Sequence, residues 1–95
     1  MPSVTQEEVD QSIKIQSFHK MGEKTTVCLT TMKNGFEIVT SSSCVNPEDF
    51  DMQLGCEIAR KRAIDKVWEL LGFTKQNLLH YLLSEMDEKA EEPGG

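Results

Sequence analysis

The sequence predicts an α+β fold in which a small antiparallel sheet packs with helices. Lys33-Asn34-Gly35 separates two Thr- and Val-rich stretches, and Asn46-Pro47 precedes a long stretch with helical periodicity. Asn-Gly is the strongest short-range signal of a β-hairpin, and Asn followed by Pro is typical of a helix start. These two signals define most of the predicted architecture.

A short helix and a strand are expected before the hairpin. Thr5 and Glu8 have the spacing of a capping box, in which each side chain satisfies an exposed amide near the other. Ile13 and Ile15 then alternate with polar residues, a pattern typical of a half-buried strand. We expect that strand near residues 13–18.

The hairpin is expected over residues 24–40. Val27 and Leu29 share one face of its first strand, and Phe36 and Ile38 share one face of the return strand, because side chains alternate along a strand. The Asn-Gly pair between the strands is expected to form a two-residue type I′ turn, in which both residues have positive φ.

Two helices are expected after the hairpin. The first spans about residues 47–71 and stops at Gly72, because glycine is common just after a helix end. Thr74 caps the second, over about residues 75–89, which is rich in leucine. A row of small or slim side chains on the first helix predicts that another helix approaches it closely; this row consists of Met52, Cys56, Ala59 and Ala63.

Length and composition limit the chain to one domain. Ninety-five residues fit a single compact unit, which we place at residues 1–90, and residues 91–95 are expected to form a disordered acidic and glycine-rich tail. Six aromatic residues give little material for a core, and the leucines of the last helix exceed what so small a unit covers. We therefore expect a helix-mediated dimer.

The charge balance excludes some partners. Ten Lys and Arg against sixteen Asp and Glu give a net charge of −6, the wrong sign for a protein that neutralises the backbone of a long nucleic acid. No apolar run approaches the roughly 20 residues of a membrane span, and no signal peptide is visible. Three cysteines without CxxC spacing fit reduced thiols, so we expect a cytoplasmic protein without a membrane partner.

The sequence offers no set of catalytic or metal-ligating residues. Zinc sites need Cys and His at ligand spacing, and nucleophilic catalysis needs a base near the nucleophile. The candidates stand singly along the chain: His19, Cys28, Cys44, Cys56 and His80. The glycines are isolated and form no phosphate-binding loop, so neither a metal nor a cofactor is expected.

Three charged residues lie inside the apolar stripe of the predicted first helix. Glu57, Arg60 and Lys61 fall within the arc that its apolar residues occupy at about 100° per residue. One alternative is that they lie at the rim of the core and extend into water. The other is that the helix leaves the core there and offers cations to a pocket.

The residues that remain suggest a site for a small anionic nucleotide. The ring of Phe36 can stack on a base, and the hydroxyls of Ser42 and Ser43 and the helix start at Asn46 can bind phosphate, as can Arg60. Each residue also has a simpler role: Phe36 in the hairpin core, Asn46 as a plain cap, and the serines in a polar loop.

A series of motifs resembles a known family. Thr25-Thr-Val-Cys-Leu, Lys33-Asn-Gly-Phe-Glu-Ile-Val, Ser42-Ser-Cys-Val-Asn-Pro-Glu-Asp-Phe-Asp, Gly55-Cys-Glu-Ile-Ala-Arg and Lys66-Val-Trp-Glu-Leu-Leu-Gly-Phe occur in this order. They cover about half of the chain. The series resembles the small tailed-phage gene-49/gene-66 products, and among them it is similar to the first family of Thoeris anti-defence proteins.

The resemblance implies a non-enzymatic sponge. Such a protein captures the cyclic ADP-ribose isomer that bacterial TIR-domain proteins make as an alarm signal, in some members also cyclic oligonucleotides, and does not hydrolyse it. It implies a dimer with ligand near the subunit contact, hexamers as a larger assembly, and action in the cytoplasm of the bacterial host. Phe36 and Asn46 match ligand contacts of the family. Arg60 matches the Arg after Glu-Ile-Ala, and Lys61 follows it.

Two rival functions stay open. The net charge of −6 and the acidic residues 85–92 suit a protein-binding module that inhibits a host factor by surface mimicry. A catalytic phosphodiesterase is the other, although the sequence shows neither a base nor a metal set for it.

Overall fold

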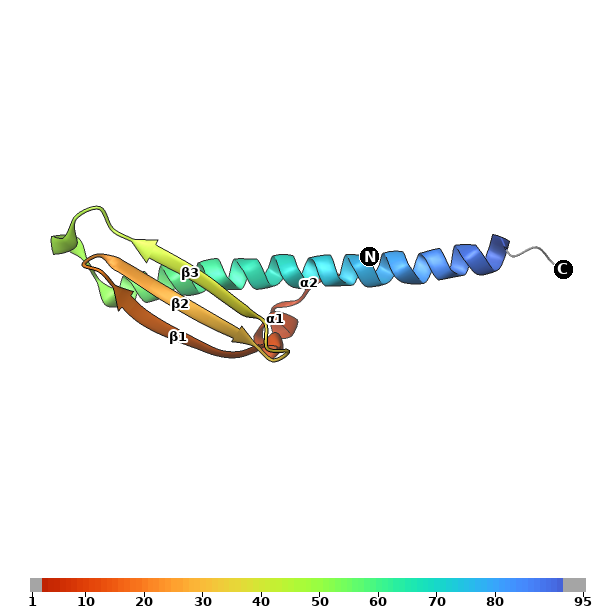
Figure 1. The fold of residues 1–95 in the computed structure, drawn as a ribbon, viewed down its shortest axis with the longest axis horizontal. Helices are drawn as coiled ribbons and strands as arrows, with labels where there is room; N and C mark the ends of the chain where they lie inside the picture. Colours follow the sequence, from red (N-terminus) through yellow and green to blue (C-terminus); the bar gives the residue numbers. More distant parts are fainter. Residues whose placement is uncertain (1–2, 92–95) are drawn as a thin grey trace.

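The computed structural model describes residues 3–91, and the side chains of residues 3–86, and it confirms the α+β class (Figure 1). A three-stranded antiparallel sheet lies against one long helix, α2 (Met52–Glu91), and the short helix α1 (Gln6–Ser12) lies at one end of the sheet. The strands are neighbours in space as in sequence, in the order β1 (Ile13–Met21), β2 (Thr25–Met32) and β3 (Glu37–Ser43).

The amino-terminal prediction is confirmed and extended. Thr5 caps α1 by accepting a hydrogen bond from the Glu8 amide at 3.2 Å, and its hydroxyl donates to the Glu8 carboxylate at 3.3 Å. The predicted strand is present but continues three residues further, to Met21, because β1 pairs with β2 along that whole length.

The hairpin is confirmed, but its predicted type I′ turn is wrong. The Gly35 amide donates to the Met32 carbonyl at 2.9 Å, and the Met32 amide donates to the Phe36 carbonyl at 2.8 Å. Gly35 has φ 92°, whereas no described residue other than glycine, Asn34 included, has positive φ. The loop therefore has three residues with glycine in the left-handed region, a common alternative to the two-residue turn.

The predicted start of the long helix is also wrong. Asn46 does act as a cap, but only for the 3₁₀ turn η1 (Pro47–Asp49), because Phe50 returns to an extended conformation with ψ 127°. The α-helix begins at Met52, after Asp51, whose Oδ1 accepts hydrogen bonds from the amides of Gln53 at 3.0 Å and Leu54 at 3.3 Å.

The predicted break at Gly72 is wrong as well, since α2 is one continuous helix of 40 residues. Gly72 does not adopt the left-handed conformation that ends a helix. The Thr74 hydroxyl donates to the Leu70 carbonyl at 2.8 Å within the helix rather than capping a new one. The expected disordered tail at residues 91–95 lies outside the described residues, apart from Glu91.

The row of small residues on α2 packs against the sheet, so the prediction that it meets another helix is wrong. Ala59 and Ala63 are fully buried against Cys28 of β2, with Phe18 beside them. Gly55 is buried against Thr26, so that a Cβ at this position would overlap the threonine hydroxyl. Small side chains on both elements thus bring helix and sheet close together.

The larger apolar side chains gather where α1, the hairpin and α2 meet. Val9, Met32, Ile38 and Val67 form this cluster, one from each of α1, β2, β3 and α2. Around it pack Val4, Ile13, Ile64, Trp68, Leu70 and Leu71.

An ion pair ties the amino terminus to α2. The Lys75 ammonium lies 2.7 Å from one carboxylate oxygen of Glu8 and 2.8 Å from the other, and it also donates to the Ser3 carbonyl at 2.6 Å. The hydrogen bond from the Lys75 ammonium to the Glu8 carboxylate lowers the pKa of Glu8 from its usual value, although desolvation of the carboxylate works in the opposite direction.

Two glycine substitutions test the close contact and the continuity of α2. Gly55→Ala forces a methyl group onto Thr26, and we expect a loss of about 1–3 kcal/mol in the free energy of unfolding, as for other overpacked sites. Gly72→Ala meets nothing within 4 Å, so it should gain about 0.5–1 kcal/mol as a helix-interior replacement. Urea denaturation measures both, and a loss for Gly72→Ala would indicate that the helix ends there.

A pH series tests the ion pair. Folding lowers the pKa of Glu8, so its charge stabilises the fold above the unfolded-state pKa, and this contribution disappears as the pH falls through the lower folded-state pKa. The Tm difference between wild type and Glu8→Gln should therefore be larger at pH 6 than at pH 3. Glu7→Gln, on the same helix, is the control; a pH-independent difference for Glu8→Gln contradicts the assignment.

Candidate functional site

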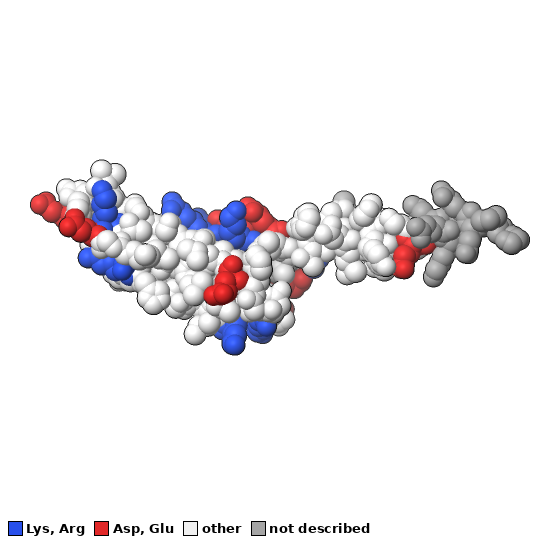
Figure 2. All heavy atoms as spheres, viewed as in Figure 1, with Lys and Arg blue, Asp and Glu red and all other residues white. Residues whose placement is uncertain are grey.

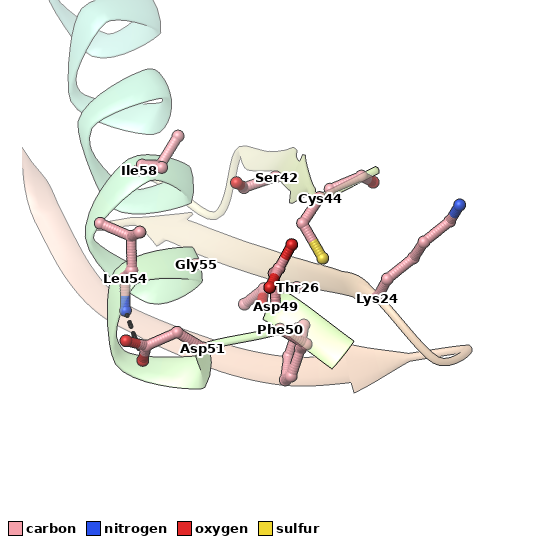
Figure 3. A pocket seen from close by; sticks show the side chains of 11 residues that line it. Lys24, Thr26, Ser42, Cys44, Asp49, Phe50, Asp51, Leu54, Gly55 and Ile58 are labelled. Atoms are coloured by element: carbon pink, nitrogen blue, oxygen red, sulfur yellow. Dashed lines mark hydrogen bonds between the residues drawn. The ribbon is translucent and has the colours of Figure 1, made fainter. Parts of the chain in front are cut away.

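A small pocket with both polar and apolar lining residues lies at the end of the sheet where α2 begins (Figure 3). Its volume is about 80 Å³, below the roughly 300–1,000 Å³ of sites that enclose a whole drug-sized ligand. The pocket therefore suits one group of a ligand, such as a sugar, rather than all of it. It is lined by Lys24, Thr26, Ser42, Ser43, Cys44, Asp49, Phe50, Asp51, Leu54, Gly55 and Ile58.

The local sequence builds this pocket by interrupting the helix start. Asn46 accepts a hydrogen bond from the Glu48 amide at 3.1 Å and closes the 3₁₀ turn. The extended Phe50 then separates this turn from α2. The strand side is fixed by β-pairing, in which Thr26 lies opposite Ser42 and the Cys44 amide donates to the Lys24 carbonyl at 3.0 Å.

The pocket combines hydroxyl groups with charges of both signs. Thr26 and Ser42 are buried, and in Figure 3 Asp49 points toward Cys44, which directly follows β3. Lys24 stands at the rim with its ammonium directed away from the centre, where it donates to the Val45 carbonyl at 3.0 Å. A carboxylate beside hydroxyls is suited to a ribose, whose hydroxyls donate to it, while a phosphate is favoured only at the Lys24 side.

An aromatic ring borders the pocket on its other side. Phe50 lines it, and the Lys20 ammonium lies 4.7 Å from the centre of this ring. A cation at that distance is attracted to the ring face. One face of Phe50 is therefore already in contact with a cation.

The structure brings together some of the predicted site residues. Ser42 and Ser43 line the pocket, and Asn46 belongs to the adjoining turn, exposed and outside the lining. Arg60 and Lys61 are exposed on α2, beyond Ile58, and do not line the pocket. Glu57 is exposed as well, which agrees with the alternative that these three charges extend into water.

Phe36 lies at the opposite end of β3 from Asn46. Its ring is 54% exposed and borders a separate groove of about 210 Å³ beside Leu70, Leu71 and Thr74. A single chain therefore does not bring Phe36 and Asn46 to one ligand, and a joint site stays a prediction that needs a second subunit.

The sequence prediction missed Lys24, Asp49 and Phe50 as lining residues. The predicted first helix, over about residues 47–71, includes Asp49, which lies instead in the 3₁₀ turn beside the pocket. The hairpin itself indicated that Lys24 lies near the serines. In an antiparallel pair the end of the second strand, at Ser42 and Ser43, lies beside the start of the first, which directly follows Lys24.

Among the described residues, no group of three or more His, Cys, Asp or Glu side chains could hold a metal ion. Cys28, Cys44 and Cys56 are free thiols. No helix in the described range is long and apolar enough to cross a membrane.

The protein is a small two-layer α+β protein with a pocket at one end of its sheet. The chain belongs to the phage protein family named for N4 Gp49 and phage Sf6 gene 66, whose model matches residues 4–79. This confirms the broader part of the resemblance. No curated protein and no solved structure matches the chain.

Proposed function

We propose that this phage protein binds a cyclic ADP-ribose signal made by bacterial TIR-domain proteins and sequesters it unchanged in the host cytoplasm. The observation that carries the proposal is the pocket at the start of α2, whose lining combines the buried Thr26 and Ser42 with the exposed Asp49. Membership of the phage family and the similarity to Thoeris anti-defence proteins support it. Capture in this way would suppress Thoeris-type immunity.

The chemistry of the pocket assigns a group of the ligand to each part. A ribose hydroxyl donates to Asp49 and exchanges hydrogen bonds with Ser42. A phosphate lies on the outer side, near Lys24, because the carboxylates inside the pocket repel it. Since the volume of about 80 Å³ holds only part of such a ligand, the remainder lies over the exposed turn at Asn46.

Calorimetry with cyclic ADP-ribose and its isomers tests the proposal. Asp49→Asn removes a charged hydrogen-bond acceptor, and such bonds contribute about 1.5–3 kcal/mol, so affinity should fall by about tenfold or more. Lys24→Met should also weaken binding, and Asn46→Ala should do so if the ligand extends over the turn. Asp65→Asn, an exposed acid on α2 outside the pocket, is the matched control.

Four results would contradict the proposal in different ways. If Asp49→Asn and Asp65→Asn bind with equal affinity, the ligand does not bind in this pocket. If affinity falls only in Phe36→Ala, the ligand binds at the other end of the sheet. Recovery of a hydrolysed product after heating, with more than one turnover per site, indicates an enzyme. No binding to any isomer, together with stoichiometric capture of a host protein, favours the acidic inhibitor.

A further inference from the structure

A second cation stands beside the pocket at the start of α2, outside its lining. Figure 2 shows basic and acidic side chains close together at this end of the molecule. Among the described residues that line the pocket, Lys24 is the cation, and its ammonium already donates to the Val45 carbonyl. The ammonium of Lys20 lies 4.7 Å from the centre of the Phe50 ring, which borders the pocket. Lys20 is thus one side chain away from the pocket.

The sheet places Lys20 in the same row as the hydroxyl groups of the pocket. Lys20 of β1 lies opposite Thr26 of β2, and Thr26 lies opposite Ser42 of β3. Residues directly opposite each other in an antiparallel pair share one face of the sheet, and Thr26 and Ser42 both line the pocket. Lys20 therefore extends from the face of the sheet that carries the pocket. Lys24 directly precedes β2, so both lysines come from the end of the sheet where β1 turns into β2.

The ring of Phe50 restricts where the Lys20 ammonium lies. Lys20 is exposed, and an exposed lysine side chain has many rotamers to lose when it is fixed. The extended backbone at Phe50 separates the 3₁₀ turn from α2, and the ring reaches β1, where it meets the ammonium. Because a cation is attracted to the face of an aromatic ring, Phe50 is a positioning residue that holds the ammonium at the rim of the pocket.

No carboxylate among the described residues forms an ion pair with Lys20. The two ion pairs found there lie elsewhere, one within α2 and one between α2 and α1. Asp51, an acid of the pocket lining, accepts hydrogen bonds from the amides of Gln53 and Leu54 at the start of α2. An ammonium has three N–H donors, and a contact with a ring leaves donors for an anion. Lys20 is therefore a cation with a fixed place and no counter-ion.

We propose that Lys20, held by Phe50, forms an anion site at the rim of the pocket and binds a phosphate group of the ligand. As a contact to that ligand, the site rests on the proposed function and extends it. With a ribose beside Asp49, one phosphate lies near Lys24, within the lining, and a second lies at Lys20, just outside it. Two lysines at one end of the sheet suit a diphosphate, whose adjacent phosphate groups each take one ammonium.

NMR of the lysine side chains, with inorganic pyrophosphate as the probe, tests the anion site without a nucleotide. Protons above an aromatic ring resonate upfield, so the Hε protons of Lys20 should be shifted upfield in wild type and lose this shift in Phe50→Leu. At constant ionic strength, pyrophosphate should shift the Lys20 signals in a saturable way and leave those of Lys14 unchanged. Lys14 is the matched control, because it is exposed on the same strand and has no cation–π contact within the described residues.

Calorimetry with the isomers of cyclic ADP-ribose tests the contact to the ligand. Lys20→Met removes a charged hydrogen-bond donor, so affinity should fall by about tenfold or more. Lys20→Arg should retain most of the affinity, because a guanidinium both stacks on an aromatic face and binds phosphate. Lys14→Met should bind like wild type.

The two experiments separate the anion site from the proposed function. Equal responses of Lys14 and Lys20 to pyrophosphate overturn the anion site and leave the proposed function standing. Unchanged affinity of Lys20→Met for an isomer that wild type binds does the same. A saturable response of Lys20 to pyrophosphate, in a protein that binds none of the isomers, supports the anion site and contradicts the proposed function.

Discussion

The close contact between α2 and β2 determines how the rest of the chain is arranged. Gly55, Ala59 and Ala63 present almost no side-chain volume to the sheet, and β2 meets them with Thr26 and Cys28. Side chains of β3 and α2 then fix the helix along the sheet edge: the Thr40 hydroxyl donates to the Ala59 carbonyl at 2.7 Å, and Arg62 Nη1 donates to the Ser41 carbonyl at 2.7 Å. The main cluster of larger buried apolar side chains, Val9, Met32, Ile38 and Val67, lies at the hairpin end.

The two ends of the sheet consequently have different chemistry. At the start of α2, hydroxyl and carboxylate groups border the pocket together with the apolar side chains of Phe50, Leu54 and Ile58. At the hairpin end, Met32 and Leu70 provide apolar surface that extends to the exposed ring of Phe36. The two ends can therefore be altered independently by mutation.

The sequence predicts which helices and strands are present better than it predicts where each begins and ends. Asn34-Gly35 marks the hairpin, yet a two-residue turn would pair Lys33 with Phe36, and the observed loop pairs Met32 with Phe36. Such a one-residue shift exchanges the two faces of a strand, so the partners of Ser42, and with them the pocket, could not be derived. Glycine is common at helix ends, but the local sequence around Gly72 does not reveal that the helix continues past it to Glu91. Phe36 and Asn46 lie at opposite ends of β3, and the separation of two residues along a strand follows from the limits of that strand, which the sequence leaves open.

The ion pair between Lys75 and Glu8 has a consequence for the order of folding. The sheet is a meander of neighbouring strands, and such local pairings form quickly. The contact of Lys75 with Glu8 spans 67 residues and that with Ser3 spans 72, so the loop they close is among the longest in the chain and its closure carries a larger entropic cost. During synthesis, this ion pair can form only after residue 75 has emerged, and until then α1 is held by the packing of Val9 in the core and by the hydrogen bond from the Lys33 amide to the Ser12 carbonyl at 2.9 Å.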